Sequence, residues 1–194
     1  MVELAPYPTP LGIFAPFFAR KSETLVIKEK VLSLSGDSFD IKTVDGRPIF
    51  QVKGSAWSLS GRKMVCDMGG NHLFTIRKKH LAIHSTYYAE DPNGNQFFDV
   101  TSKFSIGSSK AYGNFVSATG KQERLFMKGD FFDRSADITD AATKQPVATI
   151  RRQFLNAREL IAGQQTYEVT IAPNVDMAVI VAMCICLDEK RNEK

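Results

Sequence analysis

The chain has 194 residues, a formal net charge of +4 and a hydrophobic fraction of 43%. This length limits it to one domain or two small ones, and the composition is sufficient for a full core. The mild positive charge is compatible with an anionic partner but does not require one. The three cysteines, Cys66, Cys184 and Cys186, have no zinc-ligand spacing and form no disulfide framework, so a reducing, intracellular setting is expected.

Residues 1–22 are predicted to form an extended, proline-rich N-terminal arm. The segment lacks the basic start of a secretion signal, and its prolines would interrupt any apolar helix. We therefore expect no secretion signal, and we expect the arm to lie along the domain with its phenylalanines packed against it. The residues concerned are Pro6, Pro8, Pro10 and Pro16, with Phe14, Phe17 and Phe18.

Residues 23–194 are predicted to form a single domain that is almost entirely β-structure until its last helix. Short runs rich in Val, Ile, Thr and Phe alternate with polar residues between turn signals. A short helix is also expected near residues 157–162. We expect strands at residues 24–28, 30–34, 39–43, 49–53, 63–67, 72–77, 83–88, 96–104, 114–117, 124–128, 135–140, 147–152 and 165–172.

A weak repeat runs through these strands. Three turns carry a glycine that is followed four residues later by Phe50, Phe74 or Phe98. Residues 140–151 form a degenerate fourth copy. Asp or Asn beside glycine favours the tight turn of a β-hairpin, and alternation then sends each phenylalanine to one face. A spacing of roughly 24 residues is also found in solenoids and propellers. We interpret the copies as hairpins of one antiparallel meander, which closes into a barrel.

The C-terminal segment predicts a buried helix at about residues 174–190. Residues 177–187 contain no polar side chain other than two thiols, so the helix has no face suited to water. The apolar run is too short to span a bilayer, which needs roughly 20 residues. We therefore expect no transmembrane span and a helix enclosed by the barrel. Asn174 is the expected N-cap, with Asp176 in the first turn.

Several motifs together resemble the LURP-one-related family, known from plants and fungi. The resemblance covers roughly residues 10–190, and its last two motifs are the most specific. The motifs are Pro16-Phe17-Phe18, Leu25-Val26-Ile27-Lys28, Phe39-Asp40-Ile41, Asp45-Gly46 with Phe50-Gln51-Val52, Lys128-Gly129-Asp130-Phe131-Phe132-Asp133-Arg134, and Tyr167-Glu168-Val169 with Ala172-Pro173-Asn174-Val175-Asp176-Met177-Ala178.

The family is similar to the tubby C-terminal domain and to phospholipid scramblases. The resemblance implies a mainly β fold, a closed antiparallel barrel of about twelve strands around a central hydrophobic C-terminal helix. It brings no defined catalytic activity. Tubby-type domains bind phosphoinositide headgroups through surface lysines and arginines, and plant family members are linked to pathogen defence. Scramblases move lipids with calcium, but the palmitoylated cysteine cluster that they use is absent from this chain.

Basic residues are the candidate site. Alternation directs Lys53, Arg77 and Arg151 outward at equivalent repeat positions, and if the hairpins lie side by side their ends form one positive patch. Such a patch attracts phosphate headgroups. The competing interpretation is an ordinary solvated barrel exterior. The complete predicted anion- or lipid-binding set is Lys53, Arg62, Lys63, Arg77, Lys78, Lys79, Arg151 and Arg152.

No catalytic or metal-binding signature stands out. The acidic series Asp130, Asp133, Asp137 and Asp140 lacks the spacing of a calcium loop. The histidines His72, His80 and His84 have no partner at ligand spacing. Walker, nucleophile-elbow and dinucleotide-binding motifs are absent from the sequence. We therefore expect no enzyme activity, no catalytic residue, no metal and no cofactor.

The sequence thus predicts a non-enzymatic module that binds a phosphoinositide-bearing or otherwise anionic membrane surface. The alternative is a protein-interaction scaffold in stress or defence signalling that does not bind lipid. Nucleic acid is disfavoured because the charge is modest and no aromatic stacking motif accompanies the basic residues. We expect a cytoplasmic protein, peripheral at membranes. The sequence does not predict an oligomeric state.

Overall fold

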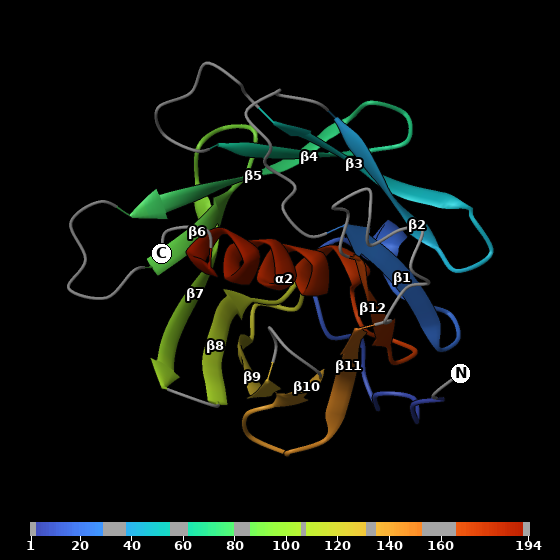
Figure 1. Cartoon of the computed structure of the whole chain (residues 1–194), viewed down its shortest axis with the longest axis vertical. Helices are drawn as coiled ribbons and strands as arrows, with labels where there is room; N and C mark the ends of the chain where they lie inside the picture. The colour runs from blue at the N-terminus through green and yellow to red at the C-terminus, as the bar shows by residue number, and fades with distance from the viewer. Residues whose placement is uncertain are drawn as a thin grey trace, which may run out of the picture.

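In a computed structural model, twelve antiparallel strands surround one central helix (Figure 1). The structure describes residues 3–28, 38–54, 62–79, 86–105, 108–130, 135–152 and 166–191. The strands are β1 (Glu23–Lys28), β2 (Phe39–Thr43), β3 (Pro48–Gly54), β4 (Lys63–Asp67), β5 (His72–Lys79), β6 (Thr86–Glu90), β7 (Gln96–Ser105), β8 (Ser108–Val116), β9 (Gln122–Asp130), β10 (Ser135–Asp140), β11 (Pro146–Arg152) and β12 (Thr166–Ile171).

The sheet closes on itself because β1 pairs with both β2 and β12. Every other strand pairs with its neighbours in the sequence, so the barrel is a simple meander. At the seam, Glu23 lies opposite Ile171 and Ile27 opposite Tyr167. Closure leaves no strand of the barrel with an unpaired edge. The predicted closed antiparallel barrel around a C-terminal helix is confirmed.

Tight turns form where the repeat predicts them. Gly46, Gly70 and Gly94 all have positive φ, between 82° and 89°, a conformation that glycine adopts without strain. The phenylalanine that follows each glycine is buried, as is the aliphatic residue two positions later. These inward side chains are Phe50, Val52, Phe74, Ile76, Phe98 and Val100. The repeat therefore consists of hairpins of one meander, with its apolar face turned into the barrel.

Helix α2 (Met177–Arg191) fills the lumen. Its residues from Met177 to Asp188 are all buried, which explains why this segment needs no polar face. The predicted cap is wrong by two residues. Asp176 is the N-cap, and its Oδ1 accepts the amide N–H of Ala178 at 2.8 Å. Asn174 instead has a positive φ of 67° and donates its side-chain amide to the carbonyl of Tyr7.

The N-terminal arm lies against the start of α2, as expected, and holds it by backbone pairing. Leu11 forms a parallel bridge with Val175, and Phe18 an antiparallel bridge with Asp176. The Asp176 Oδ2 accepts the amides of Ile13 and Phe14, at 2.8 and 2.7 Å. A Cβ on Gly12 would lie 2.0 Å from the Cβ of Asp176, so only glycine permits this approach. The arm therefore closes one end of the barrel.

Aromatic rings of the arm extend the core. Phe17 lies 4.9 Å from Phe50, and Phe14 lies 5.9 Å from Phe74 and 5.6 Å from Phe97, measured between ring centroids. These contacts confirm that Phe14 and Phe17 pack against the barrel. The strand predicted at residues 30–34, the helix predicted at 157–162, and Trp57 lie outside the described residues.

Candidate functional site

The barrel has two different ends. At the turn end, short turns at residues 44–47, 68–71, 91–95, 117–121 and 141–145 join the strands, beside the arm and the start of α2. At the helix-exit end, the odd-numbered strands from β1 to β11 finish and the even-numbered strands begin, and α2 runs towards it (Figure 1). The connections there run mainly through residues that the structure does not describe.

The predicted basic residues gather at the helix-exit end. Lys53 and Lys79 are exposed near the ends of β3 and β5, and Arg62 is exposed just before β4. These three strands are neighbours, so this part of the predicted patch is contiguous. Arg151 is also exposed and near the end of its strand, β11, but β11 lies on the opposite side of the barrel from β5. The geometry is therefore a ring around one end rather than one patch on adjacent hairpins.

Three of the predicted residues contribute little free charge to this ring. Lys63 points into the barrel and is only 1% exposed, because it shares the inward side of β4 with Val65. Lys78 lies on the inward side of β5 and is half-buried. The Arg77 Nη1 lies 3.0 Å from the Glu90 Oε1 in a salt bridge. The side chain of Arg152 lies outside the described set.

Two exposed lysines that the sequence reasoning missed complete the ring. Lys110 of β8 lies directly opposite Lys128 of β9, and both side chains are exposed. Lys103 of β7 occupies the register position on the other side of Lys110. Like charges directly opposite on adjacent strands destabilise a sheet, so nothing in folding alone favours this arrangement. We call the exposed side chains Lys53, Arg62, Lys79, Lys110, Lys128 and Arg151 the basic rim.

Acidic residues compensate the basic rim only in part. Among the described side chains within the last three strand positions at this end, the outward acidic ones are Asp40, Asp137 and Glu168. Asp137 lies opposite Lys128 and Glu168 opposite Arg151 in the strand register. Among the described side chains, the six of the basic rim thus outnumber the three acidic ones at this end.

Three aspartates in the turns at the other end have lowered pKa values. A hydrogen bond from Thr43 lowers the pKa of Asp45, and bonds from Asn71 and Asn95 lower the pKa values of Asp67 and Asp91. These hydrogen bonds favour the ionised carboxylate, so the three turn aspartates remain charged at neutral pH. The turn end thus combines ionised carboxylates with basic side chains, namely Lys42, Arg47, Lys121 and Lys144.

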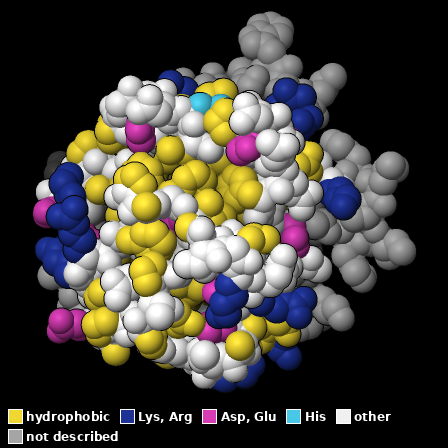
Figure 2. Space-filling model, turned by 180° about the vertical axis from the view of Figure 1, so that it is seen from behind, with side chains coloured by type: hydrophobic (Ala, Val, Ile, Leu, Met, Phe, Trp, Pro, Cys, Tyr) yellow, Lys and Arg dark blue, Asp and Glu magenta, His cyan; other side chains and the backbone are white. Residues whose placement is uncertain are grey.

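The surface distribution fits a peripheral ring. Seen from behind the view of Figure 1, hydrophobic side chains gather near the centre of the face, while Lys and Arg side chains lie on both sides of it and below it (Figure 2). A flat partner on this central face would contact mainly uncharged surface.

A polar cluster lies inside the lumen near the basic rim. The Tyr167 hydroxyl donates to the Asp188 Oδ2 at 3.0 Å, and both residues are buried. Burial raises the pKa of the neighbouring Cys184 thiol well above its ordinary value, and the charge of Asp188 adds to this effect. A thiol that is buried and protonated is a poor nucleophile. Across the described part of the chain, no three His, Cys, Asp or Glu side chains converge as a metal site.

Comparisons with known proteins agree on one family. The profile of the LURP-one-related family matches residues 23–188. Protein LURP-one-related 10 of Arabidopsis thaliana is 24% identical over 196 residues, covering 97% of this chain and 93% of that protein. Protein LURP-one-related 15 of the same plant is 24% identical over 175 residues, covering 87% and 80%.

A solved structure shares the fold. The X-ray structure of a protein from Arabidopsis thaliana superposes with a TM-score of 0.66 at 18% identity, covering 94% of this chain and 99% of that one. Within the described residues, no helix has both the length and the apolar character needed to cross a membrane. The barrel, the enclosed helix and the family match over residues 23–188 together show that this chain belongs to the LURP-one-related family.

Proposed function

We propose that this chain is a non-catalytic module that docks on anionic, phosphoinositide-bearing membrane surfaces through the basic rim. The observation that supports this most directly is the ring of six exposed Lys and Arg side chains at one end of the barrel. A ring around one end can meet a flat surface with several members at once. Each Lys or Arg near an anionic surface contributes about 1 kcal/mol.

The proposal includes a defined orientation. The helix-exit end carries the basic rim and faces the anionic surface, with the turn aspartates Asp45, Asp67 and Asp91 directed away from it. The directly opposed pair of Lys110 and Lys128 adds to the argument, since a phosphate placed between two ammonium groups relieves their repulsion. A headgroup phosphate placed there would contact the ammonium groups of both Lys110 and Lys128.

Co-sedimentation with liposomes of different phosphoinositide content tests the proposal. The informative variant is Lys53→Gln/Lys110→Gln/Lys128→Gln, which should weaken partitioning by about 3 kcal/mol, or roughly 100-fold. Its matched control is Lys42→Gln/Lys121→Gln/Lys144→Gln, which removes the same number of positive charges near the turn end. Wild-type binding should also weaken between low and physiological salt.

The outcomes separate the candidate functions. Loss of binding in the rim variant alone supports docking through the helix-exit end. Equal loss in both variants would mean that net charge, and not the rim, attracts the membrane. Failure of the wild type to bind any anionic liposome would remove the proposal and favour a protein-interaction scaffold.

A further inference from the structure

A cleft in the barrel wall near the turn end is independent of the basic rim. It has a volume of about 300 Å³, at the lower limit for sites that hold small molecules. Strands β7 and β8 supply most of the lining, with one residue from the start of β9. The lining residues are Gln96, Phe97, Phe98, Asp99, Asn114, Phe115, Val116 and Gln122.

The cleft has an aromatic floor that is fixed in place. Phe98 and Phe115 are buried cross-strand partners, with ring centroids 6.1 Å apart. A Cβ on Gly113 would lie 3.0 Å from the Phe98 ring, so the ring rests directly over this glycine. Phe97 contacts Phe14 of the arm, whereas Val116 is 45% exposed. These side chains give the cleft a preformed apolar part.

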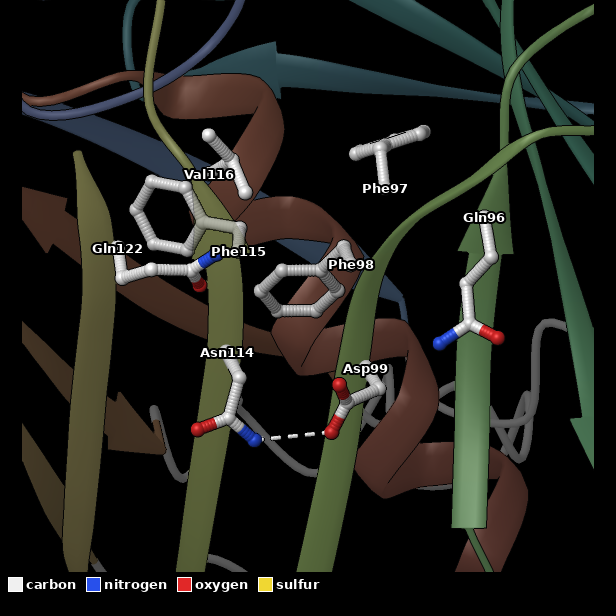
Figure 3. A pocket seen from close by; sticks show the side chains of 8 residues that line it. All are labelled: Gln96, Phe97, Phe98, Asp99, Asn114, Phe115, Val116 and Gln122. Atoms are coloured by element: carbon white, nitrogen blue, oxygen red, sulfur yellow. Dashed lines mark hydrogen bonds between the residues drawn. The ribbon is translucent and has the colours of Figure 1, made fainter. Parts of the chain in front are cut away.

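Asp99 gives the cleft its only ionisable group. Its Oδ2 accepts a hydrogen bond from the Asn114 side-chain amide at 2.8 Å, the dashed line below the phenyl rings in Figure 3. The Asn114 Oδ1 accepts in turn from the Arg124 Nε at 2.9 Å, and the Arg124 guanidinium lies over the Tyr112 ring. Within the described residues, no second donor bonds to the Asp99 carboxylate and no cation forms a salt bridge with it.

The hydrogen bonds among Asp99, Asn114 and Arg124 favour a cation as the ligand of the cleft. Because the Arg124 Nε donates to the Asn114 Oδ1, the NH₂ group of that amide points to Asp99 and donates to its Oδ2. The Asp99 Oδ1 is left as an acceptor for a ligand, and an anionic ligand would be repelled by the carboxylate. We propose that the cleft binds a small primary amine with an apolar body, whose ammonium group donates to Asp99 and whose body packs on Phe97 and Val116.

NMR titration with phenethylamine tests this. The expected result is saturable shifts of the Asp99, Asn114 and Val116 amides, with a dissociation constant in the millimolar range typical of so small a ligand. Its uncharged analogue 2-phenylethanol should bind about tenfold more weakly, because the charge-assisted hydrogen bond is lost. Its anionic analogue 3-phenylpropionate should cause no shifts in the cleft.

Three variants make the test specific. Asp99→Asn keeps the shape and should weaken phenethylamine binding about tenfold. Asp137→Asn, which alters an exposed carboxylate outside the cleft that also accepts a hydrogen bond across strands, should leave binding unchanged. Val116→Trp should block the cleft, while an otherwise unchanged NMR spectrum shows that the barrel is folded. Equal binding of the amine and the alcohol, full binding by Asp99→Asn, or no shifts at millimolar phenethylamine would overturn the proposal.

Discussion

The shared carboxylate of Asp176 should hold the arm and the helix together. It is completely buried and accepts three backbone amides, two from the arm and one from α2. Asp176→Ala leaves these donors without an acceptor. An unsatisfied buried donor costs about 1–3 kcal/mol, so we expect a loss of about 3 kcal/mol or more in the free energy of unfolding. Release of the arm into water limits the loss, because freed amides can bond to solvent.

An Asp176→Asn variant tests the same reasoning more finely. Its side chain has one acceptor oxygen, so it can serve either the arm amides of Ile13 and Phe14 or the cap amide of Ala178. Burial raises the pKa of Asp176 while these amides oppose that shift, and the neutral amide also removes the cost of burying a charge. We therefore expect a smaller loss, about 1–2 kcal/mol.

Urea unfolding and hydrogen exchange measure both effects. In Asp176→Ala, the amides of Leu11, Ile13 and Phe14 should exchange much faster, while strands on the far side of the barrel keep their protection. Asp137→Ala, which removes a carboxylate from the exposed face of β10, should cost less than about 1 kcal/mol. A loss below 0.5 kcal/mol for Asp176→Ala, with unchanged arm protection, would refute the role assigned to this carboxylate.

Three further changes probe the core and the arm. Ile180→Asp places an unpaired charge in the fully buried helix and should prevent folding. Its control, Val44→Asp at a site that is 46% exposed, should be tolerated. A soluble, folded Ile180→Asp protein would contradict the enclosed helix. Gly12→Ala should destabilise the arm as strongly as Asp176→Ala in the same exchange experiment, because its Cβ collides with that residue. Tyr7→Phe removes a 2.5 Å hydrogen bond to Asp140 and should cost about 1.5–3 kcal/mol in urea unfolding. Burial and then Asp140 raise the pKa of Tyr7 from 10.0 to about 12, so its stabilisation is complete below about pH 10 and is lost as the pH rises through about 12. That alkaline decline should be absent from Tyr7→Phe, and an identical decline in both proteins would exclude Tyr7 as its cause.

Local features of the sequence predict most of the fold. The glycines of the turns, such as Gly46 and Gly70, determine the hairpins because they adopt a backbone conformation that few other residues tolerate. Alternation then determines which side chains enter the core. The absence of any polar face in residues 177–187 predicts an enclosed helix for a similar reason, since the information lies within the segment itself.

The N-cap and the rim depended on contacts between distant segments. Asn174 looks like a cap in the sequence, but the arm, more than 160 residues earlier in the chain, requires the buried acceptor of Asp176. Lys110 and Lys128 become neighbours only through the register of β8 and β9, which their local sequence does not fix. Lys63 is part of the candidate set as a neighbour of Arg62, although alternation with Val65 two residues later indicates the inward side of β4.

The seam between β1 and β12 bears on how the protein is made. Strand β1 cannot pair with β12 until nearly the whole barrel has been synthesised, because Glu23 lies opposite Ile171. Helix α2 follows all twelve strands, so their apolar faces have nothing to cover them until it is made. Contacts so distant in sequence make folding slow and expose the nascent chain to aggregation. A chain truncated before residue 177 would therefore have the strands of the barrel but no helix to fill the lumen. Such a product is a natural client for chaperones and proteases.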